Sequence, residues 1–270
     1  AAGYHTEIVS TADIAQTVGS VHLPYDHDNA YESAKALIKR AIENYRNRDA
    51  KKVRIPEHQK PLIAGFSVDA IKYMLGGSFR GSFRPLNDAI ISGRIKGVAG
   101  IVGCNNPKHK IAAFPLALTK LFIAADVLVL ETGCAAQACA KEGLLTPETA
   151  LSLAGPGLRE VCEAVGIPPV LHLGSCVDNA RILEAATEIV REGGLGDDLS
   201  TLPAVGIAPE WMSEKAVAIG CYFVASGVDV ILGHPFHIAG SENVVKFLRD
   251  ETQKMFGGGF HDADSPEAAF

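Results

Sequence analysis

The sequence predicts an α/β protein with a doubly wound, mostly parallel, Rossmann-like sheet of about six strands and a helical N-terminal lead-in. From residue 61 onward, short apolar runs alternate with helical segments, as in parallel strands joined by crossover helices. The apolar runs are continuous, as expected for strands buried on both faces. Residues 1–60 lack this pattern. We therefore predict a lead-in and linker over 1–60 and a Rossmann-like domain over 61–270.

The lead-in contains one predicted helix, over residues 31–47. Its apolar residues recur at spacings of three and four and so form one face, made of Ala34, Leu37, Ile38, Ala41, Ile42 and Tyr45. The segment from Lys51 to Pro61 is polar and contains two prolines, which indicates a linker.

The domain's predicted strands each end in glycine or another small residue, and a helical pattern follows. These strands cover residues 62–65, 98–103, 127–133, 170–174, 204–208 and 228–233. The helices between and after them are predicted over residues 68–75, 110–123, 135–142, 157–165, 177–192 and 214–226.

Composition excludes several classes of protein. Of the 270 residues, 47% are hydrophobic and 21% are charged, which is typical of a globular chain. The net charge of −6 argues against a nucleic-acid or anionic-membrane partner. The most apolar stretch, residues 216–233, contains Asp229 and two internal glycines, so it is interpreted as a helix–strand unit and not as a membrane span. No secretory signal is visible, and we expect a cytoplasmic location. The chain starts without Met and ends in what resembles a helix start, so we expect a fragment.

Common motifs of this fold class are missing from the sequence. It contains no Gly-x-Gly-x-x-Gly after the first strand, no Gly-x4-Gly-Lys-Ser/Thr, no His-Glu-x-x-His and no Gly-x-Ser-x-Gly. Nicotinamide binding, nucleotide hydrolysis and serine hydrolysis are therefore disfavoured.

Three cysteines occupy equivalent places in the predicted fold. Cys104, Cys134 and Cys176 each follow a glycine by one or two residues, where a predicted strand ends. Because the carboxyl ends of parallel strands meet at the ligand-binding edge of such a sheet, we expect the thiols to converge there. We also expect a helix to begin near each thiol and to favour its thiolate. Converging thiolates indicate a soft metal or an iron–sulfur cluster. The ordinary alternative is that small residues suit crowded turns.

The remaining cysteines and histidines are interpreted as structural. Cys139 lies one turn into the helix after Cys134, Cys162 lies on an amphipathic helix and Cys221 lies in an apolar one. A buried free cysteine acts as a small hydrophobe. Because a four-iron cluster usually takes four protein ligands, three thiols leave it incomplete. Four histidines lie near the same edge in the predicted fold, and each is interpreted as a core or surface residue: His109, His172, His234 and His237.

Four segments around these residues resemble the nickel-dependent carbon monoxide dehydrogenases of anaerobes: 100–108, 131–137, 171–179 and 208–216. The similarity runs from about residue 30 to 255 and covers the C-terminal portion, less than half, of a full catalytic subunit. The resemblance implies Rossmann-like domains behind a helical domain. It also implies a nickel–iron–sulfur C-cluster that interconverts CO plus water with CO2, two protons and two electrons.

The resemblance also implies roles for individual residues. Cys104 and Cys134 would ligate iron and Cys176 would ligate nickel. Lys215 would lie beside the bound substrate, where its charge assists proton transfer and stabilises CO2, and Ile219 would line the CO pocket. Without the resemblance, Lys215 would be interpreted as a solvated lysine in a helix that Ser213 caps.

The chain departs from the family because the other C-cluster ligands, a histidine and two cysteines, lie upstream in the family. We therefore expect the chain to be apo or incompletely metallated, and inactive alone. The partners implied are the remainder of the subunit, a second copy in a homodimer, a ferredoxin-type electron acceptor and, in some members, an acetyl-CoA synthase. Two alternatives stay open: a non-catalytic thiol- or zinc-binding module, and a reductase similar to the hybrid-cluster proteins.

Overall fold

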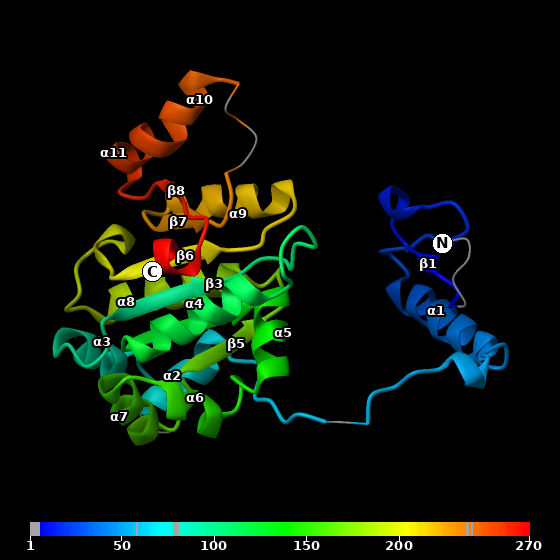
Figure 1. Cartoon of the computed structure of the whole chain (residues 1–270), viewed down its shortest axis with the longest axis horizontal. Coiled ribbons are helices and arrows are strands. Elements are labelled where there is room, and N and C mark those ends of the chain that lie inside the picture. The colour runs from blue at the N-terminus through cyan, green and yellow to red at the C-terminus, as the bar shows by residue number, and fades with distance from the viewer. Residues whose placement is uncertain (1–5, 58, 78–80, 236–237, 239) are drawn as a thin grey trace. The chain divides into compact units, whose positions relative to one another are not determined.

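The computed structural model describes residues 6–57, 59–77, 81–235, 238 and 240–270 (Figure 1). The chain forms two compact units, Ala1–Gln59 and Lys60–Phe270. In the smaller unit, strands β1 (Val9–Ser10) and β2 (Val21–His22) pair in parallel, and the long helix α1 covers Ala30–Tyr45. The helix was predicted and the two strands were not. Two short 3-10 helices complete this unit, Asp13–Ala15 and Ala50–Lys52.

The larger unit is built on a six-stranded sheet in which every strand pair is parallel. Its strands are β3 (Gly97–Ile101), β4 (Val127–Thr132), β5 (Val170–Gly174), β6 (Ala204–Ala208), β7 (Asp229–Leu232) and β8 (Phe260–Asp262). Their order across the sheet is β5-β4-β3-β6-β7-β8. The chain therefore adds β4 and β5 on one side of β3 and then returns to its other side for β6. This is the order of a doubly wound fold, and its switch point lies between β3 and β6. The predicted fold class is confirmed.

Helices cover both faces of this sheet. On one face α4 (Ala113–Ala124) contacts α5 (Gly133–Glu142), α6 (Pro147–Leu153) and α12 (Pro266–Ala269). On the other, α8 (Ala180–Glu192) contacts α2 (Val68–Gly76) and α3 (Arg84–Ile91), while α9 (Glu214–Ala225) contacts α11 (Thr252–Phe256). The remaining helices are α7 (Pro156–Val165), the 3-10 helix Leu199–Thr201, α10 (Glu242–Lys246) and the π-helix Phe247–Glu251. Because helices cover both faces, every residue of β3 is buried.

Two strand predictions need correction. Residues 62–65 do not form a strand, because this segment makes only isolated backbone hydrogen bonds: Ile63 donates to Leu145, and Gly65 donates to the carbonyl of His172. The sixth strand is instead β8, which pairs with β7 and was not predicted. It has three residues, and two of them, His261 and Asp262, are exposed. A short polar edge strand carries no apolar run that a sequence pattern would reveal.

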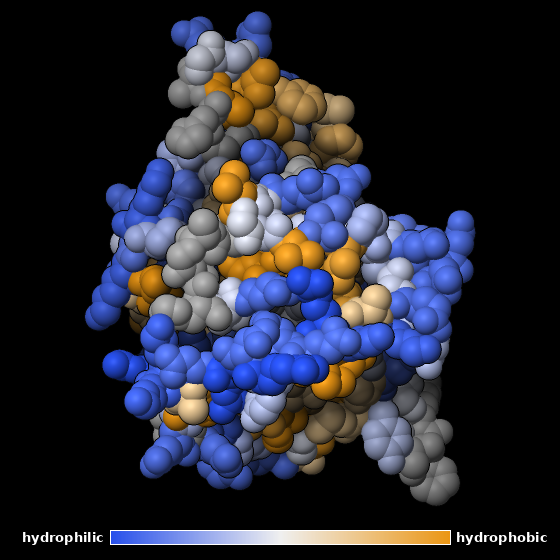
Figure 2. Space-filling view, turned by 90° about the vertical axis from the view of Figure 1, so that its right-hand side faces the viewer, coloured by the Kyte–Doolittle hydropathy of each residue, from blue (hydrophilic) through white to orange (hydrophobic). Residues whose placement is uncertain are grey.

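The surface is largely hydrophilic on the face shown in Figure 2, and apolar side chains gather there in separate patches. Apolar side chains of α10, α11 and the π-helix between them are partly exposed: Val244, Phe247, Met255 and Phe256. Within the described part of the chain, no helix has the length and apolar character needed to span a membrane.

Candidate metal centre

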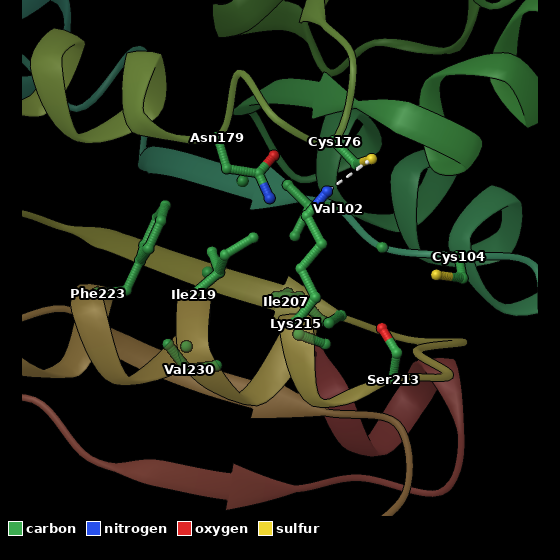
Figure 3. A pocket seen from close by; sticks show the side chains of 16 residues that line it. Val102, Cys104, Cys176, Asn179, Ile207, Ser213, Lys215, Ile219, Phe223 and Val230 are labelled. Atoms are coloured by element: carbon green, nitrogen blue, oxygen red, sulfur yellow. Dashed lines mark hydrogen bonds between the residues drawn. The ribbon is translucent and has the colours of Figure 1, made fainter. Parts of the chain in front are cut away.

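A small apolar pocket lies at the switch point between the carboxyl ends of β3 and β6. Its volume is about 60 Å³, which suits a molecule of a few atoms and not a dinucleotide. Ile207, Ile219 and Phe223 contribute to its apolar wall. Its polar residues include Cys104, Cys176, Asn179, Ser213 and Lys215 (Figure 3). A site at this position is the expected location of a ligand in an open α/β sheet.

The three predicted cysteines lie in turns that follow adjacent strands. Cys104 follows β3 and is half-buried, whereas Cys134 at the start of α5 and Cys176 after β5 are exposed. All three are free thiols. Burial raises the pKa of Cys104 most strongly, and the charges of Cys134 and Cys176 raise it further. A backbone hydrogen bond from Met212 and the charge of Lys215 lower that pKa in part. The three thiols and Lys215 thus lie within electrostatic reach of one another.

The expectation that a helix begins near each thiol holds for Cys134 and is wrong for Cys104. Cys134 is the second residue of α5, but α4 begins only at Ala113, well beyond Cys104. The predicted helix from residue 177 begins at Ala180 instead. Asp178 holds a turn ahead of it by accepting hydrogen bonds from the backbone and hydroxyl of Ser175, at 2.7 and 3.1 Å.

Lys215 lies in the first turn of α9 and contacts a cysteine. Its Nζ donates to Sγ of Cys176 at 3.0 Å, across the mouth of the pocket (Figure 3). Lys215 is exposed, as the sequence alone would also predict, but the side chain of Ser213 makes no capping hydrogen bond to the helix. Ile219, one helical turn further, lines the same pocket. A cation beside a thiol and an apolar cavity can hold a small molecule that develops negative charge.

The close approach of two cysteine turns depends on Gly133. Its φ is +61°, and a Cβ at this position would lie 3.1 Å from Cβ of Cys176. The turn that carries Cys134 therefore packs directly against the turn that carries Cys176. A side chain at Gly133 would push the two turns apart.

The donor set fits part of an iron–sulfur cluster better than a single ion. Within the described ranges, no three histidine, cysteine, aspartate or glutamate side chains are grouped closely enough to hold one metal ion. The thiols of Cys104, Cys134 and Cys176 instead come from separate segments that follow adjacent strands at one sheet edge. Thiolates are the ligands that iron–sulfur clusters and nickel take in such sites.

The other candidate ligands have ordinary surroundings. His172 accepts a hydrogen bond from the Gly174 backbone at 3.1 Å, and burial lowers its pKa. The ring of His234 stacks on Trp211 at 4.4 Å and on His109 at 6.0 Å. His237 lies outside the described residues. Burial raises the thiol pKa of all three remaining cysteines, Cys139, Cys162 and Cys221, and that of Cys162 reaches about 12.

Two buried carboxyl groups near the site were not predicted. Glu210 follows β6 and accepts hydrogen bonds from the backbones of Ala112 and Phe114 at 3.0 and 3.2 Å. It thereby ties the loop after β6 to the start of α4. Glu131 is at the end of β4 and fully buried. The only sequence signal for either residue is an acidic side chain next to an apolar run.

Comparison with known proteins gives one consistent result. The family described as Prismane/CO dehydrogenase matches residues 1–267. Carbon monoxide dehydrogenase 1 of Methanosarcina acetivorans is 48% identical over 257 residues, which cover 95% of this chain and 40% of the relative. The corresponding enzyme of Carboxydothermus hydrogenoformans is 41% identical, with 98% and 43% covered.

Similar solved structures are also carbon monoxide dehydrogenases. The Ni-free carbon monoxide dehydrogenase of Thermococcus sp. AM4, produced without the CooC maturase, has a TM-score of 0.88 at 48% identity and covers 98% of this chain and 41% of that one. Carbon monoxide dehydrogenase IV of C. hydrogenoformans has a TM-score of 0.90 at 39% identity, with 98% and 43% covered. The chain therefore spans about 40% of the length of the curated relatives it matches.

Proposed function

The chain belongs to the Prismane/CO dehydrogenase family, and on that premise we propose that it supplies part of the C-cluster site of a nickel-dependent carbon monoxide dehydrogenase. The observation that carries this proposal is the contact between Lys215 and Cys176 at the mouth of a small apolar pocket, with Cys104 and Cys134 at the same sheet edge. A nucleotide or a large substrate does not fit this pocket.

In this proposal each polar residue of the site has a separate task. Cys104 and Cys134 hold iron, and Cys176 holds nickel. A bound cluster would supply the redox chemistry, as the acceptor of the two electrons released when CO and water become CO2 and two protons. Lys215 holds a proton at Nζ beside the oxygen of the bound one-carbon molecule, and its charge stabilises negative charge there. Ile219 and the other apolar wall residues surround the cavity beside Lys215, and a less polar surrounding strengthens such an interaction.

The proposal extends to partners that this chain does not contain. The rest of the subunit supplies a histidine and two further cysteines, the full enzyme is a cytoplasmic homodimer, and a ferredoxin-type protein takes the electrons. An acetyl-CoA synthase partner is supported by a relative in Moorella thermoacetica, named carbon monoxide dehydrogenase/acetyl-CoA synthase subunit beta, which is 36% identical over 277 residues.

Metal analysis of the chain tests this proposal. We expect the anaerobically purified chain, incubated with iron, sulfide and nickel, to bind all three at less than one full cluster per chain and to lack CO oxidation activity. Cys176→Ala should lose nickel and keep most of the iron, whereas Cys104→Ser and Cys134→Ser should lose iron and sulfide. The control is Cys162→Ala, which removes a buried thiol on α7.

Two outcomes would overturn the proposal. One is a chain that binds zinc alone at one equivalent, which would indicate a thiol- or zinc-binding module. The other is iron and nickel content that does not change in the three site variants. Iron and sulfide are assayed chemically and nickel by elemental analysis, so the test does not depend on enzyme activity.

A further inference from the structure

Two residues that begin helices near the cysteines bond to each other and not to their own helices. Thr132 is the N-cap of α5 and Asn179 is the N-cap of α8. Threonine and asparagine at this position usually accept a hydrogen bond from the backbone of their own helix. Neither side chain does so here. The hydroxyl of Thr132 instead donates to Oδ1 of Asn179, and both residues are buried.

This hydrogen bond joins the two turns that carry Cys134 and Cys176. Thr132 lies two residues before Cys134, and Asn179 lies three residues after Cys176. The ladder between β4 and β5 shifts register after Glu131, and its last pair, Thr132 with Gly174, follows this irregularity. Beyond this pair the ladder does not extend into the two turns, so side-chain contacts are what join the turns to each other.

Few other side chains provide such a connection. Asp178 bonds to Ser175, and Arg181 bonds to the carbonyl of Leu173 at 2.6 Å, so both act within the Cys176 turn and its own strand. Among the described residues, the remaining side-chain hydrogen bond from that turn to another element is the one to Lys215. A long lysine side chain restrains position less than a buried bond between two short side chains does.

We propose that Thr132 and Asn179 are positioning residues, whose buried hydrogen bond sets the separation between the Cys134 and Cys176 thiols. Its importance for metal binding rests on the proposed function, in which these thiols hold iron and nickel. The bond also orients Asn179, because its carbonyl oxygen is turned to Thr132 while its amide nitrogen lies on the pocket side (Figure 3).

Distance measurement between the two thiols tests the proposal without any metal. Cys134 and Cys176 are exposed, so nitroxide labels can be attached to them in a chain that carries Cys104→Ser and Cys221→Ala and keeps the buried Cys139 and Cys162. Dipolar electron paramagnetic resonance then reports the distribution of distances between the labels. We expect a single narrow distribution in this background and a broad or displaced one in Thr132→Val, which removes the hydroxyl and keeps the shape.

Matched variants separate positioning from general destabilisation. Thr132→Ser retains the hydroxyl and should restore the narrow distribution. Thr187→Val removes a hydroxyl that bonds to Leu183 within α8, at 2.8 Å, and should leave the label distances unchanged. If Thr132→Val does not fold, Asn179→Ala removes the same bond from the acceptor side.

An unchanged distribution in Thr132→Val and Asn179→Ala, with folding verified by circular dichroism, would refute the positioning role. It would leave the metal proposal intact, because the labelled chains contain no metal. Conversely, if the parent chain binds zinc alone while Thr132→Val still broadens the distance distribution, the proposed function is refuted and the positioning role stands.

Discussion

We expect Glu131 to lower the stability of the parent chain as the pH rises from about 4.5 to 7, and we expect Glu131→Gln to abolish this loss. Glu131 is fully buried, and burial raises its pKa to about 7. Hydrogen bonds from Thr119 at 2.6 Å and Cys139 at 3.2 Å to Oε1 lower that pKa and offset only part of the effect. The other oxygen, Oε2, has no hydrogen-bond partner among the described residues.

Proton linkage determines whether the free energy of unfolding rises or falls with pH. The folded-state pKa lies above the ordinary value of 4.5, so the folded chain binds more protons than the unfolded chain between these two pH values. The contribution of Glu131 to stability is therefore greatest below pH 4.5 and decreases by about 3 kcal/mol as the pH rises towards 7. Glutamine keeps a carbonyl acceptor for Thr119 and Cys139 and carries no charge at any pH.

Urea denaturation between pH 5 and 8 measures this effect. We compare the free energy of unfolding of the parent chain with that of Glu131→Gln at each pH, so that other titrating groups cancel in the difference. Glu184→Gln, at an exposed position on α8, serves as the control and should keep the pH dependence of the parent. Equal pH dependence in the parent chain and in Glu131→Gln would contradict the prediction.

Sequence patterns placed the three thiols well because their positions depend on local signals. Continuous apolar runs ending in glycine predicted β3, β4 and β5, and the carboxyl ends of parallel strands share one edge. The turns after these strands therefore carry Cys104, Cys134 and Cys176 at the edge where they were expected. The roles assigned to them, and to Lys215 and Ile219, came from family resemblance and stay predictions.

The features that the patterns missed depend on contacts between distant segments. Thr132 and Asn179 are 47 residues apart, and each alone resembles an ordinary helix cap. Glu131 ends an apolar run, where a polar residue usually marks the surface, but α4 and α5 cover it with Thr119 and Cys139. The wrongly predicted strand over residues 62–65 and the missed strand β8 have a similar cause. Strand formation depends on which neighbouring strand offers a free edge, and this is not visible in a local pattern.

Gly233→Ala is expected to give the largest loss of stability. Gly233 follows β7, and a Cβ there would lie 1.8 Å from the carbonyl oxygen of Pro209 and 2.8 Å from its Cα. Both atoms belong to the backbone, so no flexible side chain can move aside. The backbone of Gly233 also donates to Ala208 at 3.1 Å, which holds the loops after β6 and β7 together.

The added methyl group must separate these loops, and we expect a loss of about 3 kcal/mol, at the upper end of the usual cost of overpacking. The separation should also break the hydrogen bond from Nε1 of Trp211 to His234 and displace the loop that leads to Lys215. Urea denaturation monitored by the fluorescence of the chain's one tryptophan measures both the stability and this local change. Gly240→Ala is the matched control, because a Cβ at that glycine meets no atom of the described residues within 4 Å. If Gly233→Ala and Gly240→Ala unfold at the same urea concentration, the loops after β6 and β7 are not held at the distance seen here.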